Sequence, residues 1–223
     1  MKILALDTAT EACSAALLSG DAVYERHDIA PRRHAELILP MVDAVLAHAG
    51  LGLNDLDAIA FGRGPGAFTG VRIAAGVTQG LALGAGLPVI PVSSLAALAQ
   101  PALDNGAIVL PAIDARMGEV YWSAYESGQD GLATALVDEQ VASPDTVRVP
   151  PTGQIFGVGS GWGTYRERLG RVLHGRLSGI EPECFPLAKD MLPLAVREYN
   201  AGRCVSPEQA LPVYLRDNVV KQI

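Results

Sequence analysis

The chain lacks an excess of basic residues. Lysine and arginine together number 17, against 24 aspartate and glutamate residues, and the formal net charge of the 223 residues is -7. Proteins that bind nucleic acid by themselves usually carry a surplus of positive charge. The balance therefore argues against a free-standing nucleic-acid binder, although a partner or a local basic patch could still bring a nucleic acid close.

Cysteine and long apolar runs are also scarce. The three cysteines, Cys13, Cys184 and Cys204, lie far apart and form no C-x-x-C pair, so we expect reduced thiols rather than a disulfide framework. The most apolar stretch, residues 73–90, is interrupted by glycines and a proline, which disfavours a membrane span. The apolar run before Asp7 is too short for a signal peptide. We expect a cytoplasmic protein.

What is present is the composition of a folded protein and an alternation of strands and helices. Hydrophobic residues make up 49% of the chain and charged residues 18%, which indicates a chain with a core. The expected elements of the first half are strands at 2–7, 13–18 and 22–28, a helix over about 33–49, a strand at 58–61, a helix over about 69–84, a strand at 88–92 and a helix from Ser93 or Ser94. The pattern partly repeats later, with strands at 107–114, 119–126 and 132–139 and a strand, glycine loop and helix over 154–173.

This order predicts an α/β fold of two lobes, each with a mixed sheet flanked by helices, and a reduced second lobe. We place the first lobe at residues 1–102 and the second at 103–206, because the composition shifts at 101–106. The segment 207–223 is expected to pack back on the first lobe.

Two kinds of loop are candidates for phosphate binding. The glycine loop with Gly64, Gly66, Thr69 and Gly70 connects a buried strand to a helix, where backbone N–H groups and the helix dipole favour an anion. Gly157 and Gly159 form a weaker second loop of the same kind. The residues at the end of the first strand are Asp7, Thr8 and Thr10. Such a carboxylate can hold hydrated Mg²⁺ and the hydroxyls can reach phosphate oxygens, but these residues alone favour an Asx/ST turn that shapes the hairpin.

The helix after the glycine loop carries Arg72, Gly76, Gly80 and Gly84 at intervals of four residues. Each interior glycine costs about 1 kcal/mol relative to alanine, so a row of three needs a reason. Close approach of another backbone is the physical one. That backbone belongs either to the sheet of the same chain or to a partner.

Two further groups of residues stay without an assigned chemistry. Arg166, Arg168, Arg171, His174 and Arg176 form a local basic cluster, which is either a solvated helix face or a contact with tRNA or a partner. The stretch 114–116 is expected to shape a hairpin. The four histidines provide no pair of metal ligands at helical spacing.

Several stretches together carry a resemblance to a known family. They are Asp7–Thr10, His34–Pro40, Gly64–Ile73, Asp114–Arg116, Glu119–Tyr121 and Pro212–Arg216. The chain resembles the actin-like (ribonuclease H-like) ATPase superfamily and, within it, the TsaD/Kae1-like family, which historically carried the label glycoprotease. Catalytic members have a metal-binding H-x-x-x-H, and the corresponding positions here are Ser94 and Leu98. The resemblance is therefore to a non-catalytic member.

The resemblance implies a subunit that binds a TsaD-like catalytic protein together with a TsaE-like ATPase. Their assembly transfers a threonylcarbamoyl group to the adenosine beside the anticodon of tRNAs that read codons starting with A. The implied interface consists of Leu37, Met41, Val45, Arg72, Gly76, Gly80 and Gly84, and in isolation the same face would form a homodimer. The loops at residues 7–10, 64–70 and 157–159 are then remnants of a nucleotide site.

The resemblance also implies no metal, no resident cofactor and no contact with tRNA outside the complex, and at most weak binding of ATP and Mg²⁺ within it. Two other functions remain open at this point. Asp7 and the glycine loops are compatible with a small-molecule kinase of the actin-like class. The historical family label suggests a metallopeptidase, against which the residues at 94 and 98 argue.

Overall fold

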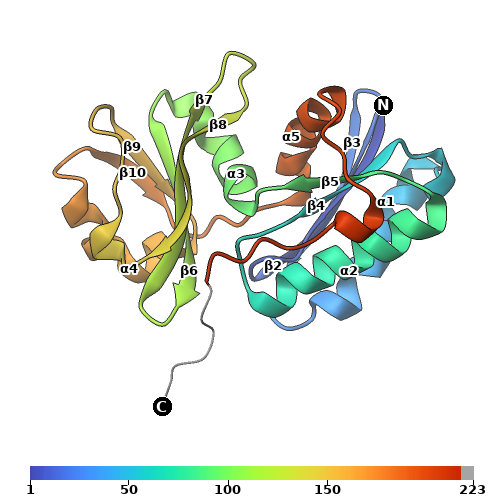
Figure 1. The fold of residues 1–223 in the computed structure, drawn as a ribbon, viewed down its shortest axis with the longest axis horizontal. Coiled ribbons are helices and arrows are strands. Elements are labelled where there is room, and N and C mark those ends of the chain that lie inside the picture. Colours follow the sequence, from blue (N-terminus) through green and yellow to red (C-terminus); the bar gives the residue numbers. More distant parts are fainter. Residues whose placement is uncertain (217–223) are drawn as a thin grey trace.

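The computed structural model describes residues 1–216, without the side chain of Asn105, as two lobes that each contain a five-stranded mixed sheet (Figure 1). The strand order is β3-β2-β1-β4-β5 in the first sheet and β10-β9-β6-β7-β8 in the second. In both sheets the first three strands along the chain are antiparallel to their neighbours. The two later strands run parallel to the first strand and extend the sheet on its free side. The expected two-lobed α/β fold is confirmed.

The strands of the first lobe are β1 (Lys2–Asp7), β2 (Ala12–Ser19), β3 (Ala22–Ile29), β4 (Ala58–Gly62) and β5 (Val89–Val92). Those of the second are β6 (Ile108–Arg116), β7 (Glu119–Ser127), β8 (Ala133–Ala142), β9 (Ile155–Val158) and β10 (Leu177–Glu181). The α-helices are α1 (His34–Ala49), α2 (Phe68–Ala85), α3 (Ser94–Ala99), α4 (Ser160–Val172) and α5 (Ala188–Asn200), and short 3₁₀ turns occur at Leu53–Asp55, Gln100–Asn105, Pro144–Thr146 and Pro207–Gln209. The sequence pattern gave no indication of β10 or α5.

The central strands β1 and β4 of the first sheet are buried on both faces, which explains their continuous apolar runs. Helices α1 and α2 cover one face, and the helix α1 contributes Ile38, Val42 and Val45 to that layer. The helix α5 covers the other face. In the described residues no helix is both long and apolar enough to cross a bilayer.

The two lobes exchange helices across their boundary. The helix α3 follows the last strand of the first sheet but packs on β6, β7 and β8 of the second. The helix α5 follows the second sheet but packs on β1, β2, β4 and β5 of the first. Both contacts differ from the expected division at residues 102 and 206, because a division by sequence order cannot anticipate helices that cross between lobes.

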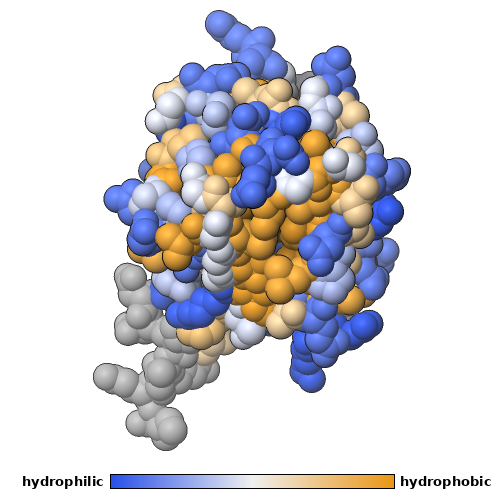
Figure 2. Space-filling view, turned by 90° about the vertical axis from the view of Figure 1, so that its right-hand side faces the viewer, coloured by the Kyte–Doolittle hydropathy of each residue, from blue (hydrophilic) through white to orange (hydrophobic). Residues whose placement is uncertain are grey.

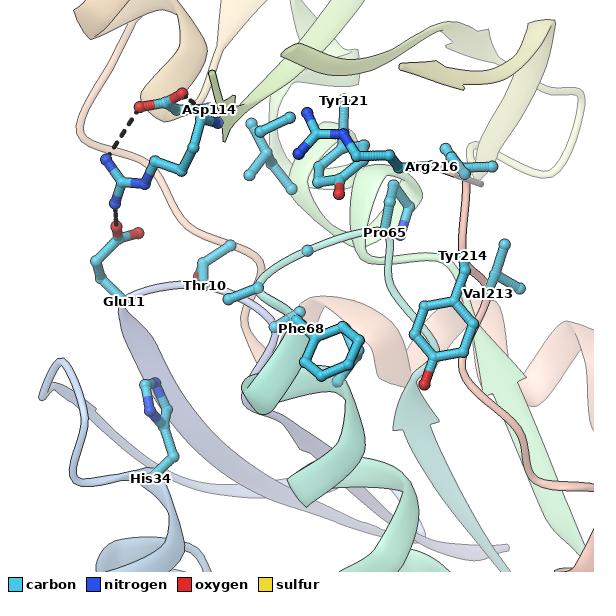
Figure 3. A pocket seen from close by; sticks show the side chains of 18 of the residues that line it. Thr10, Glu11, His34, Pro65, Phe68, Asp114, Tyr121, Val213, Tyr214 and Arg216 are labelled. Carbon is cyan, nitrogen blue, oxygen red and sulfur yellow. Dashed lines mark hydrogen bonds and ion pairs between the residues drawn. The ribbon is translucent and has the colours of Figure 1, made fainter. Parts of the chain in front are cut away.

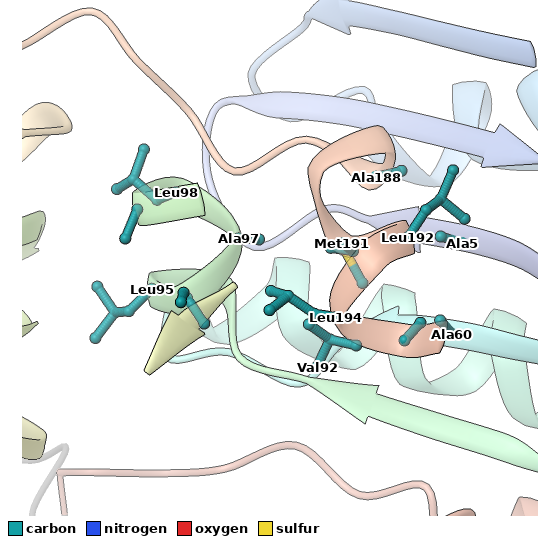
Figure 4. Packing of buried hydrophobic residues seen from close by; sticks show 14 of the residues in the cluster. Ala5, Ala60, Val92, Leu95, Ala97, Leu98, Ala188, Met191, Leu192 and Leu194 are labelled. Carbon is teal, nitrogen blue, oxygen red and sulfur yellow. The ribbon is translucent and has the colours of Figure 1, made fainter. Parts of the chain in front are cut away.

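The exchange produces one apolar cluster that spans both lobes (Figure 4). Leu95 and Leu98 of α3 and Met191 and Leu194 of α5 all belong to this cluster, which also contains Val158 from the second sheet, and Figure 4 shows Ala97 on the side of α3 that faces α5. A continuous apolar layer between the lobes stabilises their relative position.

The last described residues form a strap, residues 205–216, that returns to the first lobe and then crosses to the second. Val205 pairs with Val89 at the edge of the first sheet, and the N–H of Val213 donates to the carbonyl oxygen of Arg63 over 2.8 Å. The Arg216 guanidinium then forms an ion pair with Glu119 of β7. The part of the expected C-terminal segment after residue 216 lies outside the described residues.

Candidate functional site

The carboxylate of Asp7 accepts hydrogen bonds from other groups of the protein. The side chain is fully buried at the end of β1, where Oδ1 accepts a hydrogen bond from the N–H of Ala9 over 2.8 Å and Oδ2 accepts one from the Ser94 hydroxyl over 3.0 Å. Gly62 covers it so closely that a Cβ at that position would lie 1.7 Å from Oδ2. Burial raises the pKa of Asp7 to about 6. The Asp7 carboxylate is thus enclosed by protein atoms in the structure of residues 1–216.

The glycine loop before α2 is docked on the β1–β2 loop by its backbone. The N–H of Ala67 donates to the carbonyl oxygen of Ala9 over 2.7 Å, and the hydroxyl of Thr8 donates to the carbonyl oxygen of Gly70 over 2.7 Å. A Cβ on Gly66 would lie 2.3 Å from the carbonyl oxygen of Ala9, and one on Gly70 would lie 2.0 Å from that of Thr8. Glycine is needed at both positions because the backbone of the glycine loop lies directly against the backbone of the β1–β2 loop, which leaves no room for a side chain.

The remaining residues of the two first-lobe loops also have local roles. The hydroxyl of Thr10 accepts a hydrogen bond from the N–H of Ala12 over 3.4 Å, which is the turn-shaping arrangement. Gly64 has a φ of 89°, a left-handed conformation that glycine adopts at least cost. Thr69, in the first turn of α2, is exposed.

The second glycine loop is filled by side chains of its own lobe and of α3. The ring of Trp162 lies against Gly157, and a Cβ on Gly159 would be 2.7 Å from both the carbonyl oxygen of Ala112 and a methyl group of Leu98. Leu98 thus packs on this loop, and Ser94 binds Asp7. The side chains at positions 94 and 98 thus bind groups of the first and of the second lobe, respectively.

A cleft of about 430 Å³ remains between the lobes, beside these closed loops (Figure 3). Its walls come from the β1–β2 loop, the start of α1, the first turn of α2, the β6–β7 turn and the strap. Arg116 lies across one side, with ion pairs of 3.1 Å to Asp114 and to Glu11. Residues 114–116, which the sequence predicts only to shape a hairpin, line this cleft, and the sequence shows no signal for the cleft because its lining comes from segments far apart in the chain.

The outward side of α2 is exposed, and within residues 1–216 no backbone lies near its glycines. Among these residues, no atom is within 4 Å of a Cβ built on Gly76, Gly80 or Gly84. Packing on the sheet of the same chain, one of the two explanations for this row, therefore does not account for it. Arg72, on the same side, stacks with its guanidinium carbon 3.2 Å from the ring centroid of Phe68 and 4.9 Å from that of Tyr214.

The neighbouring residues of α1 fit the predicted interface only in part. Leu37 and Met41 are half-buried and reach the surface, but Val45 is fully buried in the core between α1 and the sheet. Its inclusion in the interface was wrong, because the buried line of α1 is Ile38, Val42 and Val45. Figure 2, seen from the first-lobe side of the molecule, shows an apolar area bordered by hydrophilic side chains.

The basic cluster on α4 is partly neutralised. Arg168 and Arg171 both form ion pairs with Asp145, and Arg176 donates to the carbonyl oxygen of Pro150 over 2.7 Å. No group of three or more His, Cys, Asp or Glu side chains could hold a metal ion in the part of the chain that the structure describes.

Comparisons with known proteins give the family. Residues 26–156 match the family model described as TsaD, tRNA N6-adenosine threonylcarbamoyltransferase. The chain is 47% identical over 224 aligned residues to the tRNA threonylcarbamoyladenosine biosynthesis protein TsaB of Escherichia coli strain K12, with 98% of this chain and 96% of the relative covered. The chain belongs to the TsaB family.

Other relatives also match this chain over nearly its whole length. The Haemophilus influenzae TsaB protein is 45% identical, with 98% of this chain and 95% of the relative covered. A solved structure described as YeaZ from Pseudomonas aeruginosa superimposes with a TM-score of 0.90 at 49% identity and covers 96% of this chain and 99% of that one. The actin-like resemblance stated from the sequence is thereby confirmed at the level of family and fold.

Proposed function

We propose that this TsaB-family protein is a non-catalytic subunit in the biosynthesis of tRNA threonylcarbamoyladenosine. Relatives that match it over almost their whole length are named for that pathway. The observation that carries the non-catalytic role is the internal use of the loop residues. Asp7 binds Ser94 and Ala9, and the glycine loops hold backbone or side chains where a phosphate would lie. The protein then acts through its surface.

We propose the exposed side of α2 and the adjoining part of α1 as the surface that docks a TsaD-like catalytic subunit. Three helical glycines with open space above them allow a partner helix to approach closely, and Arg72 with its two aromatic neighbours provides the kind of side chains that dominate binding energy at interfaces. The same face can pair two copies of this chain when the catalytic subunit is absent. A TsaE-like ATPase and the tRNA join only in the full assembly.

The decisive experiment is reconstitution with purified TsaD-like and TsaE-like proteins, tRNA, and the threonylcarbamoyl-adenylate donor. We expect threonylcarbamoyladenosine in the complete mixture, and none with this chain alone. Full modification in a mixture that lacks this chain would contradict the proposal. Titration of the isolated chain with ATP and Mg²⁺ by calorimetry is expected to give no saturable heat, and tight binding would instead support the kinase alternative.

A matched pair of variants tests the docking face. Gly80→Arg places a long side chain over the exposed side of α2, where the free chain has room for it. We expect it to abolish co-purification with the TsaD-like subunit and to shift the isolated protein to a monomer in sedimentation. Gly170→Arg on α4 of the second lobe also has open space and is expected to leave pairing unchanged. Equal pairing by both variants would show that the surface is elsewhere.

A further inference from the structure

The positive charge of the second lobe is concentrated in one part of the chain that the proposed docking role does not use. Residues 143–176 contain five arginines and two acids, an excess of three positive charges in a chain whose net charge is -7. These arginines form the basic patch, and they are Arg148, Arg166, Arg168, Arg171 and Arg176. An acidic protein with one local basic patch presents a defined surface to a polyanion.

The structure brings the two segments of the basic patch together. The guanidinium of Arg168 on α4 donates to the Ser143 hydroxyl over 2.9 Å, and that of Arg176, after α4, donates to the carbonyl oxygen of Pro150 over 2.7 Å. Arg148 lies between these two acceptors in the chain. The arginines of α4 and the segment that follows β8 therefore share one surface.

Two members of the basic patch are free to bind a partner. Arg148 and Arg166 are exposed, and neither forms an ion pair within residues 1–216. The residue before Arg148, Val147, is buried in the apolar core of the second lobe and anchors this part of the chain. The patch thus offers unpaired guanidinium groups on a backbone that is held in place.

A solvated helix face is the alternative explanation, and it accounts for only part of the basic patch. Cations are favoured near the C-terminus of a helix, which explains Arg171 in the last turn of α4. Arg166 lies in the middle of the same helix, however, and Arg148 lies outside it. Asp145 already binds Arg168 and Arg171, so its carboxylate is not available to the other two.

The basic patch lies away from the proposed docking face. Figure 1 shows α4 at one end of the molecule and the helices α1 and α2 at the other. A subunit that docks on α1 and α2 therefore leaves the patch open to a further component of the assembly. Of the components in the proposed function, tRNA is the one that carries a regular series of negative charges.

We propose that the basic patch contacts the phosphate backbone of tRNA in the assembled complex, with Arg148 and Arg166 as its free donors. The inference rests on the proposed function, from which it takes the tRNA. A guanidinium binds phosphate oxygens through paired N–H groups, and such contacts position a nucleic acid without reading its sequence. The acidic remainder of the chain opposes binding of RNA by this protein alone, so the patch adds affinity beside the contacts of other subunits.

A matched pair of variants at one position tests the sign of the charge. Gly170 lies between Arg168 and Arg171 on α4, and no described atom is within 4 Å of a Cβ built there. Gly170→Arg and Gly170→Glu both replace glycine by a better helix former, so they differ mainly in charge. Binding of labelled tRNA to the reconstituted assembly is measured by fluorescence anisotropy between about 50 and about 200 mM salt. We expect the logarithm of the binding constant to fall with the logarithm of the salt concentration more steeply for Gly170→Arg, by about one unit of slope, and less steeply for Gly170→Glu, which also binds more weakly.

Removal of the free donors gives the complementary test. In the double variant Arg148→Gln/Arg166→Gln we expect the salt slope to be smaller by about two, one for each lost phosphate contact. The KM for tRNA should rise while kcat stays unchanged, because such a contact is the same in the ground state and in the transition state. Arg26→Gln, which changes an exposed arginine on β3 of the first lobe, should leave both the slope and the KM unchanged.

Equal salt slopes for the two Gly170 variants, or an unchanged slope and KM in the double variant, would overturn the proposal. Weaker co-purification of these variants with the TsaD-like or TsaE-like protein at unchanged tRNA affinity would also overturn it, since the basic patch would then bind an acidic protein surface. Full modification in a mixture without this chain contradicts the proposed function instead, so the two proposals can fail separately.

Discussion

The side chain of Asp7 is buried against two hydrogen-bond donors, and its negative charge is costly there. Desolvation is the largest cause of the rise in its pKa from 3.8 to about 6, and the hydrogen bonds from Ala9 and Ser94 oppose it. Between these two pKa values the folded protein binds more protons than the unfolded chain. The stabilising effect of the proton on Asp7 is complete below pH 3.8 and is lost as the pH rises through about 6.

We therefore expect the protein to lose stability as the pH rises from about 3.8 to about 6, by about 3 kcal/mol from this group. The variant Asp7→Asn should be more stable than the natural protein at neutral pH and show a flatter dependence, because the amide carries no charge to desolvate. Its oxygen can still accept from Ala9 and its amino group can donate to the Ser94 hydroxyl. Urea unfolding on both sides of this pH window measures the difference.

The control for this prediction is Asp190, the other carboxyl group whose pKa is raised to about 6, mainly by desolvation. Asp190→Asn removes one titrating carboxyl but leaves Asp7 in place, so part of the pH dependence should remain. If Asp7→Asn kept the full pH dependence of the natural protein, the assignment of the effect to Asp7 would be wrong.

At the level of the elements, the glycines of α2 divide into two kinds. Gly70 in the first turn lies against the backbone of Thr8, whereas Gly80 in the middle has open space above it. Gly80→Ala is expected to stabilise the isolated protein by about 1 kcal/mol, the difference in helix propensity. Gly70→Ala should destabilise it by at least about 2 kcal/mol, because a Cβ there would lie 2.0 Å from a carbonyl oxygen.

Thermal and urea unfolding of the two alanine variants provide the measurement, and each variant is the control of the other because both make the same substitution in one helix. A stabilising Gly70→Ala or a strongly destabilising Gly80→Ala would contradict the division. The stabilised Gly80→Ala protein would also show that this glycine is not kept for the fold of the isolated chain, as a docking surface requires.

The elements that sequence patterns predicted are those with a strong local signal. Strands β1 and β4 are continuous apolar runs, and α2 follows a recognisable glycine loop. In contrast, β10 has only five residues with Gly179 in their middle, and α5 contains Pro193, so their local signals are weak. Their formation depends on contacts with β9 and with the first sheet, which a single sequence does not display.

The candidate sites were predictable to a similar extent. The motif residues were enough to indicate the family. That they contact one another could be seen only from distances in the structure, such as that between Gly62 and Asp7. The cleft could not be found from the sequence, because its walls join His34, Phe68 and Tyr214 from three separate segments. The buried side of α1 contains Ile38, whereas the adjacent Leu37 reaches the surface. A difference of one residue therefore determines which side of this helix is buried.

For the whole molecule, the question is what fixes the two lobes relative to each other. The exchanged helices α3 and α5 provide the apolar part, and two sets of ion pairs lie at the boundary. Arg63, just after β4, holds Glu139 of β8 with two hydrogen bonds of 2.9 and 3.1 Å, and the Ser93 hydroxyl donates to the same carboxylate. On the other side Arg116 pairs with Glu11.

The two ion pairs differ in burial, and this difference predicts their contributions. The side chains of Arg63 and Glu139 are 26% and 13% exposed, whereas those of Arg116 and Glu11 are 72% and 34% exposed. Arg63→Ala leaves the Glu139 carboxylate half-enclosed with the Ser93 hydroxyl, and we expect a loss of about 2 kcal/mol in the free energy of unfolding. Arg116→Ala removes two ion pairs of a well-exposed guanidinium, with Glu11 and with Asp114, and should cost less than about 1 kcal/mol.

Urea unfolding of the two variants at neutral pH tests this order, and added salt distinguishes the mechanisms. High salt should reduce the contribution of Arg116 and leave that of Arg63 largely intact, because screening acts mainly on exposed charges. Glu139→Gln completes the test, since it removes the charge but keeps an acceptor for Ser93, and it should cost less than Arg63→Ala. Equal losses for Arg63→Ala and Arg116→Ala would contradict the dependence on burial, and no measurable loss for either would leave the apolar cluster of α3 and α5 as the main contact between the lobes.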